Sequence, residues 1–287
     1  MRVIYFGDDF FIECFHILKQ YGHIISHIVV ANEDDYTSQL TALGEKENIP
    51  VLTGVFSGQF VDDLISKNNT DIIFSAGYSR KIKFDYSSIY SINIHPSILP
   101  NGRGPDAAAW ISLKHRNFAG FTFHKISAEF DEGDIISQFH ISLAVNDGWE
   151  MYMAKLKIEI IRAFPDLLEN FKESYGAAKP QSSGSSWPPI TAMERLIHWD
   201  MPHEKIHSII LSFGRWGAIV QTGSQYLLVN NLELSVYQHG LPAGNILSSD
   251  AYSITVSTSE GLAIIPKKCV VREILLTEAC SLGLPIR

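Results

Sequence analysis

The sequence predicts an α/β protein of two parts, a mostly parallel sheet covered by helices on both faces, followed by a small β-barrel. Three observations lead to this prediction. Short apolar, β-branched runs alternate with amphipathic segments up to residue 171. A cluster of Gly, Pro and Ser then interrupts the chain at residues 176–189. Short β-rich runs separated by Gly-containing turns follow this cluster.

The first part of the chain repeats a strand, a turn and a helix. The opening run at residues 2–6 stops at Gly7 and gives way to a helical pattern that ends near Gly22. Because alternating strands and helices build a parallel sheet, this order predicts a Rossmann-like sheet. Further strands are expected at residues 24–30, 71–75, 91–95, 120–126 and 134–143, and helices at residues 38–47, 61–67, 105–115 and 149–171.

The second part begins after the cluster at residues 176–189, where we place the domain boundary. The predicted domains are residues 1–180 and 190–287. The apolar tail at residues 274–286 either closes the second domain or supplies the interface of a homodimer. A helix is expected at residues 202–213, and the strands of an OB-like barrel at residues 218–222, 226–234, 253–257 and 262–265.

Composition limits the classes of partner. The 287 residues are 46% hydrophobic and 19% charged, which is typical of a globular protein. The 23 Lys and Arg against 31 Asp and Glu give a net charge of −8, so the whole chain repels polyanions and a nucleic-acid partner is not expected. No apolar run approaches the roughly 18 to 20 residues of a membrane span, and the N-terminus does not continue as a signal peptide, so we expect a cytoplasmic protein without a membrane partner.

Two polar side chains share one face of the strand expected at residues 91–95. The period of two places Asn93 and His95 on one side and the isoleucines between and before them on the other. Ligands of open α/β sheets bind at the carboxyl ends of strands. An amide beside an imidazole suits acyl transfer, because the amide can donate to an oxyanion while the imidazole moves a proton. A polar strand end held by local hydrogen bonds explains the same residues equally well.

A carboxylate follows in the next β-rich stretch. Asp131 precedes Gly133 in a turn just before another expected strand. Such a carboxylate can orient the ring of His95 or take up a proton, since catalytic imidazoles are commonly held by a third group. Asp-x-Gly is also an ordinary turn sequence, so the turn interpretation stays open.

Motifs in both halves of the chain are similar to those of a known family. The first half contains Asn93-Ile-His95, residues 96–100, Arg103-Gly104, Thr122-x-His124 and Asp131-x-Gly133. With these motifs it resembles the formyltransferases that use N10-formyltetrahydrofolate. The second half contains Ile197-His-Trp199, Arg215-Trp-Gly-Ala218 and Pro242-Ala-Gly-Asn-Ile246. With these motifs it is similar to the smaller barrel attached to methionyl-tRNA formyltransferases and to some sugar N-formyltransferases.

The resemblance implies a role for each matching residue. It makes Asn93, His95 and Asp131 the catalytic trio, in which the first two stabilise an oxyanion and Asp131 tunes His95 and moves a proton, without a metal. It makes Arg103 a contact of the amine substrate. His124 faces the same region in the family pattern, but a strand histidine with one hydrogen bond explains it as well, and we leave it outside the trio. The folate pocket is implied at Arg80, Lys81, Ile82, Ser127, Ala128, Glu129, Phe130 and Asp131.

The acceptor amine is not fixed by the resemblance. Methionyl-tRNA formyltransferases carry a basic insertion after their second strand, whereas residues 31–35 here are short and acidic. Together with the net charge, this favours a small amino sugar linked to a nucleotide. Methionyl-tRNA is the alternative acceptor.

Two further classes compete with a formyltransferase. His203-Glu204-x-x-His207 matches the H-E-x-x-H signature of zinc metallopeptidases, although Ile210 stands where the longer form of that motif needs glycine. The apolar spacing of the same segment indicates an ordinary amphipathic helix. The other class is a folate- or nucleotide-sugar-binding protein without turnover.

Overall fold

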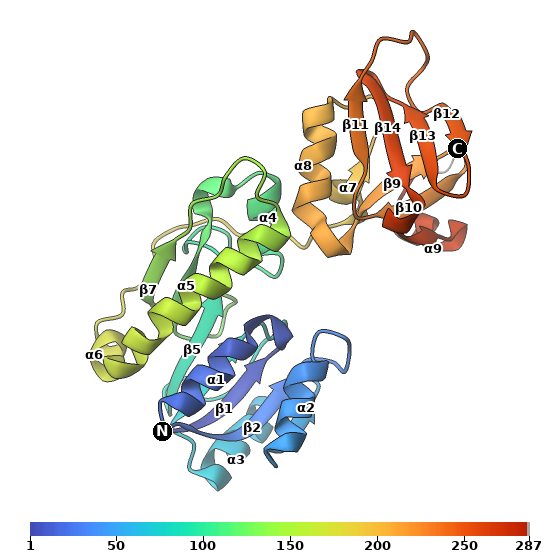
Figure 1. Ribbon diagram of the computed structural model, residues 1–287. Coiled ribbons are helices and arrows are strands. Elements are labelled where there is room, and N and C mark those ends of the chain that lie inside the picture. Colours follow the sequence, from blue (N-terminus) through green and yellow to red (C-terminus); the bar gives the residue numbers. More distant parts are fainter. Residues whose placement is uncertain (286–287) are drawn as a thin grey trace. The chain divides into compact units, whose positions relative to one another are not determined.

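The computed structural model describes residues 1–285, with the backbone alone described at residue 276 (Figure 1). The chain forms two compact units. The first unit comprises residues 1–107, 118–142 and 154–188. The second unit comprises residues 108–117, 143–153 and the chain from residue 189 onward.

The first unit contains a mixed, mostly parallel seven-stranded sheet. Its order is β3-β2-β1-β4-β5-β6-β7. The first five strands in this order are parallel, and β6 runs antiparallel to both of its neighbours. The predicted α/β class is therefore confirmed. The strands are β1 (Arg2–Gly7), β2 (Ile24–Val30), β3 (Val51–Thr53), β4 (Ile72–Ala76), β5 (Tyr90–His95), β6 (Gly120–His124) and β7 (Ile135–His140).

Helices cover both faces of this sheet (Figure 1). On one face, Phe74 of β4 stacks on Phe164 of α5 with ring centroids 4.9 Å apart. On the other face, Phe6 of β1 packs in one buried cluster with Val61 of α3. The α-helices of the first half are α1 (Ile12–Gln20), α2 (Ser38–Lys46), α3 (Gly58–Asn68), α4 (Ala107–Leu113), α5 (Trp149–Glu169) and α6 (Phe171–Gly176), with short 3-10 turns at Asp9–Phe11 and Arg116–Phe118.

The second unit is rich in antiparallel strands. Its strands form two four-stranded sheets, β15-β10-β9-β8 and β11-β14-β13-β12, in which the pairing of β8 with β9 is parallel and the others are antiparallel. A β-rich second part is thus confirmed, and its closure as an OB-like barrel stays a prediction. The strands are β8 (Leu196–Ile197), β9 (Ala218–Thr222), β10 (Gln225–Val229), β11 (Glu233–Val236), β12 (Ile246–Ser249), β13 (Ser253–Ser257), β14 (Gly261–Pro266) and β15 (Val270–Ile274).

The prediction of a single strand at residues 226–234 is wrong. The chain leaves the first sheet after Val229 and enters the second sheet at Glu233, so one β-rich run supplies β10 and β11. The backbone N–H of Asn230 between them donates to the carbonyl of Cys269. The remaining helices of this unit are α7 (Ala192–Arg195), α8 (His203–Phe213) and α9 (Leu276–Ser281), with 3-10 turns at Gly214–Trp216 and Lys267–Cys269.

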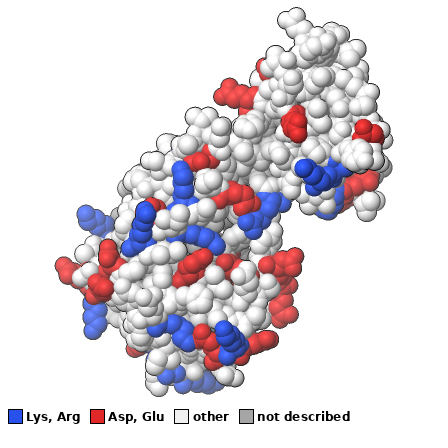
Figure 2. All heavy atoms as spheres, viewed as in Figure 1, with Lys and Arg blue, Asp and Glu red and all other residues white. Residues whose placement is uncertain are grey.

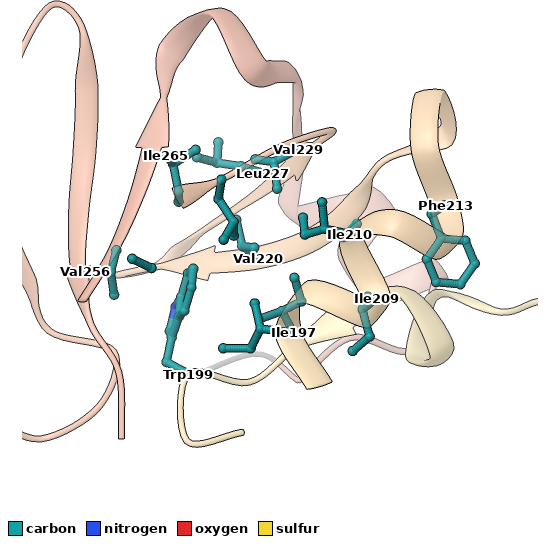
Figure 3. Close-up of a cluster of buried hydrophobic side chains, with 14 residues drawn as sticks. Ile197, Trp199, Ile209, Ile210, Phe213, Val220, Leu227, Val229, Val256 and Ile265 are labelled. Atoms are coloured by element: carbon teal, nitrogen blue, oxygen red, sulfur yellow. The ribbon is translucent and has the colours of Figure 1, made fainter. Parts of the chain in front are cut away.

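The helix α8 packs its apolar face into the core of the second unit (Figure 3). Ile206, Ile210 and Phe213 are buried there, as the amphipathic spacing predicts. The tail also packs within this unit, because Leu284 joins a buried cluster with Tyr226. Ile286, the last residue of the expected apolar tail, lies outside the described residues. Within residues 1–285, no helix is long and apolar enough to cross a bilayer.

Candidate active site

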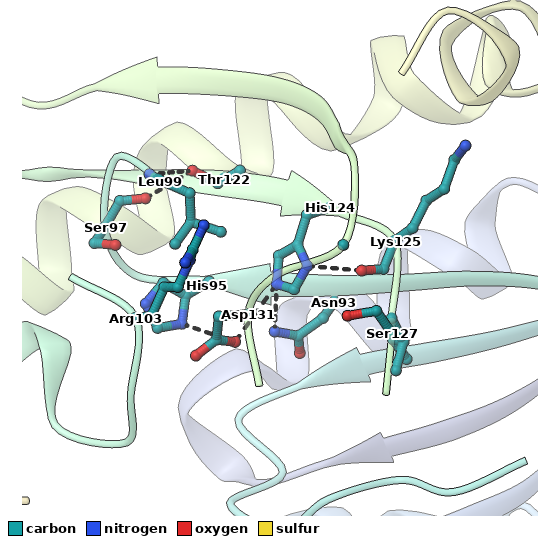
Figure 4. A network of polar contacts seen from close by, with 12 residues as sticks. Asn93, His95, Ser97, Leu99, Arg103, Thr122, His124, Lys125, Ser127 and Asp131 are labelled. Carbon is teal, nitrogen blue, oxygen red and sulfur yellow. Dashed lines mark hydrogen bonds and ion pairs between the residues drawn. The ribbon is translucent and has the colours of Figure 1, made fainter. Parts of the chain in front are cut away.

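The strand β5 carries the first two residues of the candidate site. It lies between the parallel β4 and the antiparallel β6, and β6 brings His124 opposite Asn93 and Thr122 opposite His95. Asn93 and His95 lie on the same side of β5, as the period of two predicts (Figure 4). The change of strand direction at β5 therefore gathers polar side chains from both strands at one place.

Asn93 and His124 form a hydrogen bond with a defined direction. Asn93 Nδ2 lies 3.0 Å from His124 Nε2, and His124 Nδ1 lies 2.8 Å from the carbonyl oxygen of Lys125. A carbonyl oxygen can only accept, so Nδ1 carries the ring proton and Nε2 accepts from Asn93. The amide of Asn93 has a second N–H, which can be donated to a substrate oxygen. His124, which is 2% exposed, thus orients Asn93 although sequence reasoning left it outside the trio.

Asp131 lies between the two histidines (Figure 4). Its Oδ1 is 3.4 Å from His95 Nδ1 and 3.6 Å from His124 Nε2, and its Oδ2 accepts a 3.0 Å hydrogen bond from the backbone N–H of Gly104. The structure therefore brings Asn93, His95 and Asp131 into one connected network.

The turn that carries Asp131 is tightly constrained. Asp131 has a φ of 57°, in the left-handed region that non-glycine residues rarely adopt. Two residues later, a Cβ on Gly133 would lie only 1.8 Å from the carbonyl oxygen of Lys125. Glycine is required there by this close approach, which gives a structural reason for the Asp-x-Gly sequence.

Burial and charge have opposing effects on the pKa values of His95 and Asp131. Burial lowers the pKa of His95, while the Asp131 carboxylate and the Gly102 carbonyl act in the opposite direction. Burial alone would raise the pKa of Asp131, but the charge of a protonated His95 ring and the hydrogen bond from the Gly104 N–H outweigh it and hold that pKa well below its ordinary range. His95 Nε2, 2.7 Å from the Gly102 carbonyl oxygen, carries a proton, so Nδ1 is the nitrogen that takes up a second one. The ionised Asp131 stabilises that charge.

The loop after β5 fixes the ring of His95. The Leu99–Pro100 peptide bond in this loop is cis. Ser97 Oγ donates to the carbonyl of Asn101 at 2.8 Å, and the N–H of Leu99 donates to Thr122 Oγ1 at 3.1 Å. These hydrogen bonds fix the conformation of the loop in which the Gly102 carbonyl faces His95.

A pocket opens beside this network in the first unit. It measures about 420 Å³, open solvent at its mouth included. Asn93, His124 and Asp131 line it, whereas His95 does not and is reached through Asp131. Of the residues expected to bind folate, all except Ala128 line this pocket. Its lining is completed by Ser75, Tyr78, Arg80, Lys81, Ile82, Ile126, Ser127, Glu129 and Phe130.

Arg103 is directed at neighbouring side chains of the first unit. Its Nε and Nη2 donate to Gln181 Oε1 at 3.1 and 2.8 Å, and its Nη1 donates to Glu132 Oε1 at 3.2 Å. The side chain is 13% exposed and is not part of the pocket lining. Its expected contact with the amine substrate stays a prediction.

The H-E-x-x-H segment has a different environment. His203 Nε2 lies 2.6 Å from Thr258 Oγ1, and its Nδ1 lies 4.0 Å from Glu260. In the part of the chain that the structure describes, no three His, Cys, Asp or Glu side chains are gathered in a way that could hold a metal ion.

Comparison with known proteins identifies relatives of this chain. A model of the formyl transferase family matches residues 54–168, the range that contains Asn93, His95 and Asp131. Methionyl-tRNA formyltransferase of Coprothermobacter proteolyticus is 28% identical over 185 residues, which are 64% of this chain and 60% of that protein. The chain thus spans less than two thirds of this relative. GDP-perosamine N-formyltransferase of Brucella melitensis is 29% identical over 139 residues, 47% of this chain and 54% of that protein.

A solved structure shares the fold of nearly the whole chain. It is the N-formyltransferase from Helicobacter canadensis in complex with folinic acid and dTDP-3-aminofucose. The TM-score is 0.62 at 17% identity, and the match covers 92% of this chain and 98% of the other. At this identity the likeness bears on the fold.

Proposed function

Because this chain belongs to the formyl transferase family, we propose that it transfers a formyl group from N10-formyltetrahydrofolate to the amino group of a nucleotide-linked amino sugar. The observation that carries this proposal is the network of Asn93, His124 and Asp131 at the wall of a pocket, with His95 behind Asp131. We further propose that residues 1–180 form the catalytic domain, that residues 190–287 form an OB-like barrel, and that the protein works in the cytoplasm.

The lining of the pocket suits a folate. Tyr78 and Phe130 offer aromatic surface to a flat heteroaromatic ring, and Arg80 and Lys81 bring positive charge to the same pocket. We propose that Arg80, Lys81, Ile82 and residues 127–131 hold the folate, largely through backbone groups. When bound, the folate supplies the formyl group.

Each side chain of the network has a separate role in acyl transfer. Asn93 donates its second N–H to the formyl oxygen as that oxygen gains negative charge. The Asp131 carboxylate stays ionised at neutral pH because its pKa is lowered, and it takes the proton that the amine gives up as the amine attacks the formyl carbon, sharing it with His95 Nδ1. The proton then passes to the folate nitrogen as the bond between that nitrogen and the formyl carbon breaks. A direct contact of His95 with the oxyanion would require its Nε2 to leave the Gly102 carbonyl.

Charge supports a small acceptor. The net charge is −8, and the segment at residues 31–35 is acidic. On the face drawn in Figure 2, positive and negative side chains are interspersed, without a broad basic surface that a polyanion would need. We propose that Arg103 contacts the amine substrate. Methionyl-tRNA is the second candidate acceptor, because methionyl-tRNA formyltransferases are among the relatives of this chain.

A formylation assay with mass-spectrometric detection tests the proposal. The full chain is incubated with N10-formyltetrahydrofolate and a panel of UDP-, dTDP- and GDP-linked amino sugars, with methionyl-tRNA beside them. A mass gain of one formyl group on a sugar is expected. Formylation of the tRNA alone would replace the sugar by the second candidate. Transfer to no acceptor, with folinic acid still bound, would favour a binding protein without turnover.

The Asp131→Asn variant tests the site itself. Asparagine keeps the shape of the side chain but cannot hold the proton, so the turnover number should fall at least about 100-fold. The affinity for folinic acid, measured by calorimetry, should stay within about threefold. The matched control is Asp134→Asn, which removes a nearby carboxylate that binds the Lys125 ammonium at 3.0 Å. Equal turnover in Asp131→Asn and the control would exclude the role proposed for Asp131.

A further inference from the structure

The segment at residues 176–189 has the composition of a linker, but part of it lies against the loop after β5. The N–H groups of Gly102 and Arg103 both donate to the carbonyl of Ser185, at 2.9 and 3.1 Å, and the N–H of Trp187 donates to the carbonyl of Arg103 at 2.8 Å. These are three backbone hydrogen bonds between segments more than 80 residues apart, of the kind that joins strands. The segment is therefore fixed to the first unit at this point.

Small residues in this segment permit a close approach. A Cβ on Gly184 would lie 2.0 Å from the carbonyl oxygen of Pro100. Ser185 Oγ lies 3.2 Å from Asn101 Oδ1. Glycine and serine therefore allow the two backbones to pack in direct contact. The loop that they contact is the one whose Gly102 carbonyl binds His95.

Gln181 joins this loop to the turn that carries Asp131. Its Nε2 donates to the carbonyls of Asp131 and Gly133 at 2.7 and 2.8 Å. Its Oε1 accepts from Nε and Nη2 of Arg103 at 3.1 and 2.8 Å. A glutamine amide has two N–H donors and one oxygen with two lone pairs, so these four hydrogen bonds use its whole capacity.

The turn needs such an anchor. Asp131 has a left-handed φ, which non-glycine residues rarely adopt. The direction of its carboxylate toward His95 depends on the position of the turn, and the two carbonyls that Gln181 binds lie on either side of Glu132 in that turn. Without the two hydrogen bonds from Gln181, the backbone at Asp131 can relax to a more favourable conformation and carry the carboxylate away from His95.

We propose that Gln181 is a positioning residue of the active site, which holds the Asp131 turn and the Arg103 loop in register so that Asp131 meets His95. This inference rests on the proposed function, because it assigns Gln181 a part in formyl transfer. Gln181 is not among the residues that line the pocket, so it acts through Asp131.

Two substitutions separate the contacts of Gln181. Gln181→Met keeps the length of the side chain and removes all four hydrogen bonds. Gln181→Glu keeps an acceptor for Arg103 but turns an oxygen toward the two carbonyl oxygens, so that the hold on the turn is lost. The matched control is Gln59→Met, which removes an exposed amide that donates to Asp63 Oδ1 on α3.

The readouts separate positioning from stability. With the acceptor found in the panel, the turnover number of both Gln181 variants should fall at least tenfold, while the KM for N10-formyltetrahydrofolate stays within threefold of wild type. A residue that only stabilises the fold would lower the melting temperature and leave the turnover number of the folded protein unchanged. Turnover within threefold of wild type in both variants overturns the proposal.

A second measurement needs no turnover. In the isotope-labelled full chain, ¹⁵N relaxation of the amides of Asp131, Glu132 and Gly133 should show faster motion in Gln181→Met than in wild type and no change in Gln59→Met. Equal relaxation in all three proteins would overturn the anchoring role. If the wild type transfers formyl to no amine, the proposed function fails, and the relaxation data still decide whether Gln181 holds the turn.

Discussion

Replacing Gly102 by alanine tests how closely the segment at residues 176–189 packs on the loop after β5. Gly102 has a φ of 80°, and a Cβ at this position would lie 2.6 Å from Cζ3 and 2.7 Å from Cη2 of Trp187. Trp187 is 8% exposed, so its ring cannot swing freely aside. The left-handed backbone costs alanine about 1–2 kcal/mol, and overpacking of a buried site costs about 1–3 kcal/mol. Gly102→Ala should therefore lower the free energy of unfolding by about 2–5 kcal/mol.

Gly22→Ala is the matched control for the backbone cost. Gly22 has a φ of 76°, and a Cβ there would meet nothing within 4 Å. Both glycines lie in the first unit, so urea unfolding followed by circular dichroism compares them in the same transition. Gly22→Ala should lose about 1–2 kcal/mol, and the difference between the variants measures the contact with Trp187. Losses that agree within about 0.5 kcal/mol would refute the packing argument.

Asn93→Ala should lower the turnover number by about 100- to 1,000-fold, because it removes the donor to the developing oxyanion, whereas folinic acid should still bind; a loss below threefold in the formylation assay would contradict that role. Burial raises the pKa of Asp8 to about 8. Between about pH 4 and 8 the folded protein then keeps a proton that the unfolded chain has lost, so the free energy of unfolding should fall as pH rises, by up to about 1.4 kcal/mol per unit. Asp8→Asn should flatten this dependence, and identical pH profiles for variant and wild type would show that Asp8 titrates normally.

Local sequence patterns were sufficient for the main strands of the first unit and for part of the site. The alternation at residues 91–95 predicts which side of β5 carries Asn93 and His95, and the structure has both in one network with Asp131. The strand β3, with three residues, is too short for an alternation to be visible. The run at residues 226–234 looked like one strand because periodicity does not report a change of sheet at Asn230.

Tertiary contacts explain what the sequence could not show. His124 was left outside the trio because its role depends on its register opposite Asn93 across two strands. The alternation of Thr122 and His124 on one face was the signal that could have included it. Gln181 lies in a segment rich in Gly, Pro and Ser. This composition occurs both in flexible linkers and in backbones that pack in close contact, so it did not indicate a residue of the site. Composition alone does not distinguish the two cases.

The second unit draws on residues from the middle of the chain, and this has a consequence for synthesis on the ribosome. Residues 108–117 belong to this unit, and Ala109 and Leu113 pack against its apolar core. The strand β9, at Ala218–Thr222, is made about 100 residues later, which at about 5–20 residues per second is a delay of roughly 5–20 s. During that interval the apolar face of α4 stays uncovered, because the core of the second unit against which it packs has not yet been made. A truncated chain that ends before β9 should leave this face uncovered, and chaperone binding to stalled nascent chains is expected to be strongest over that range of lengths.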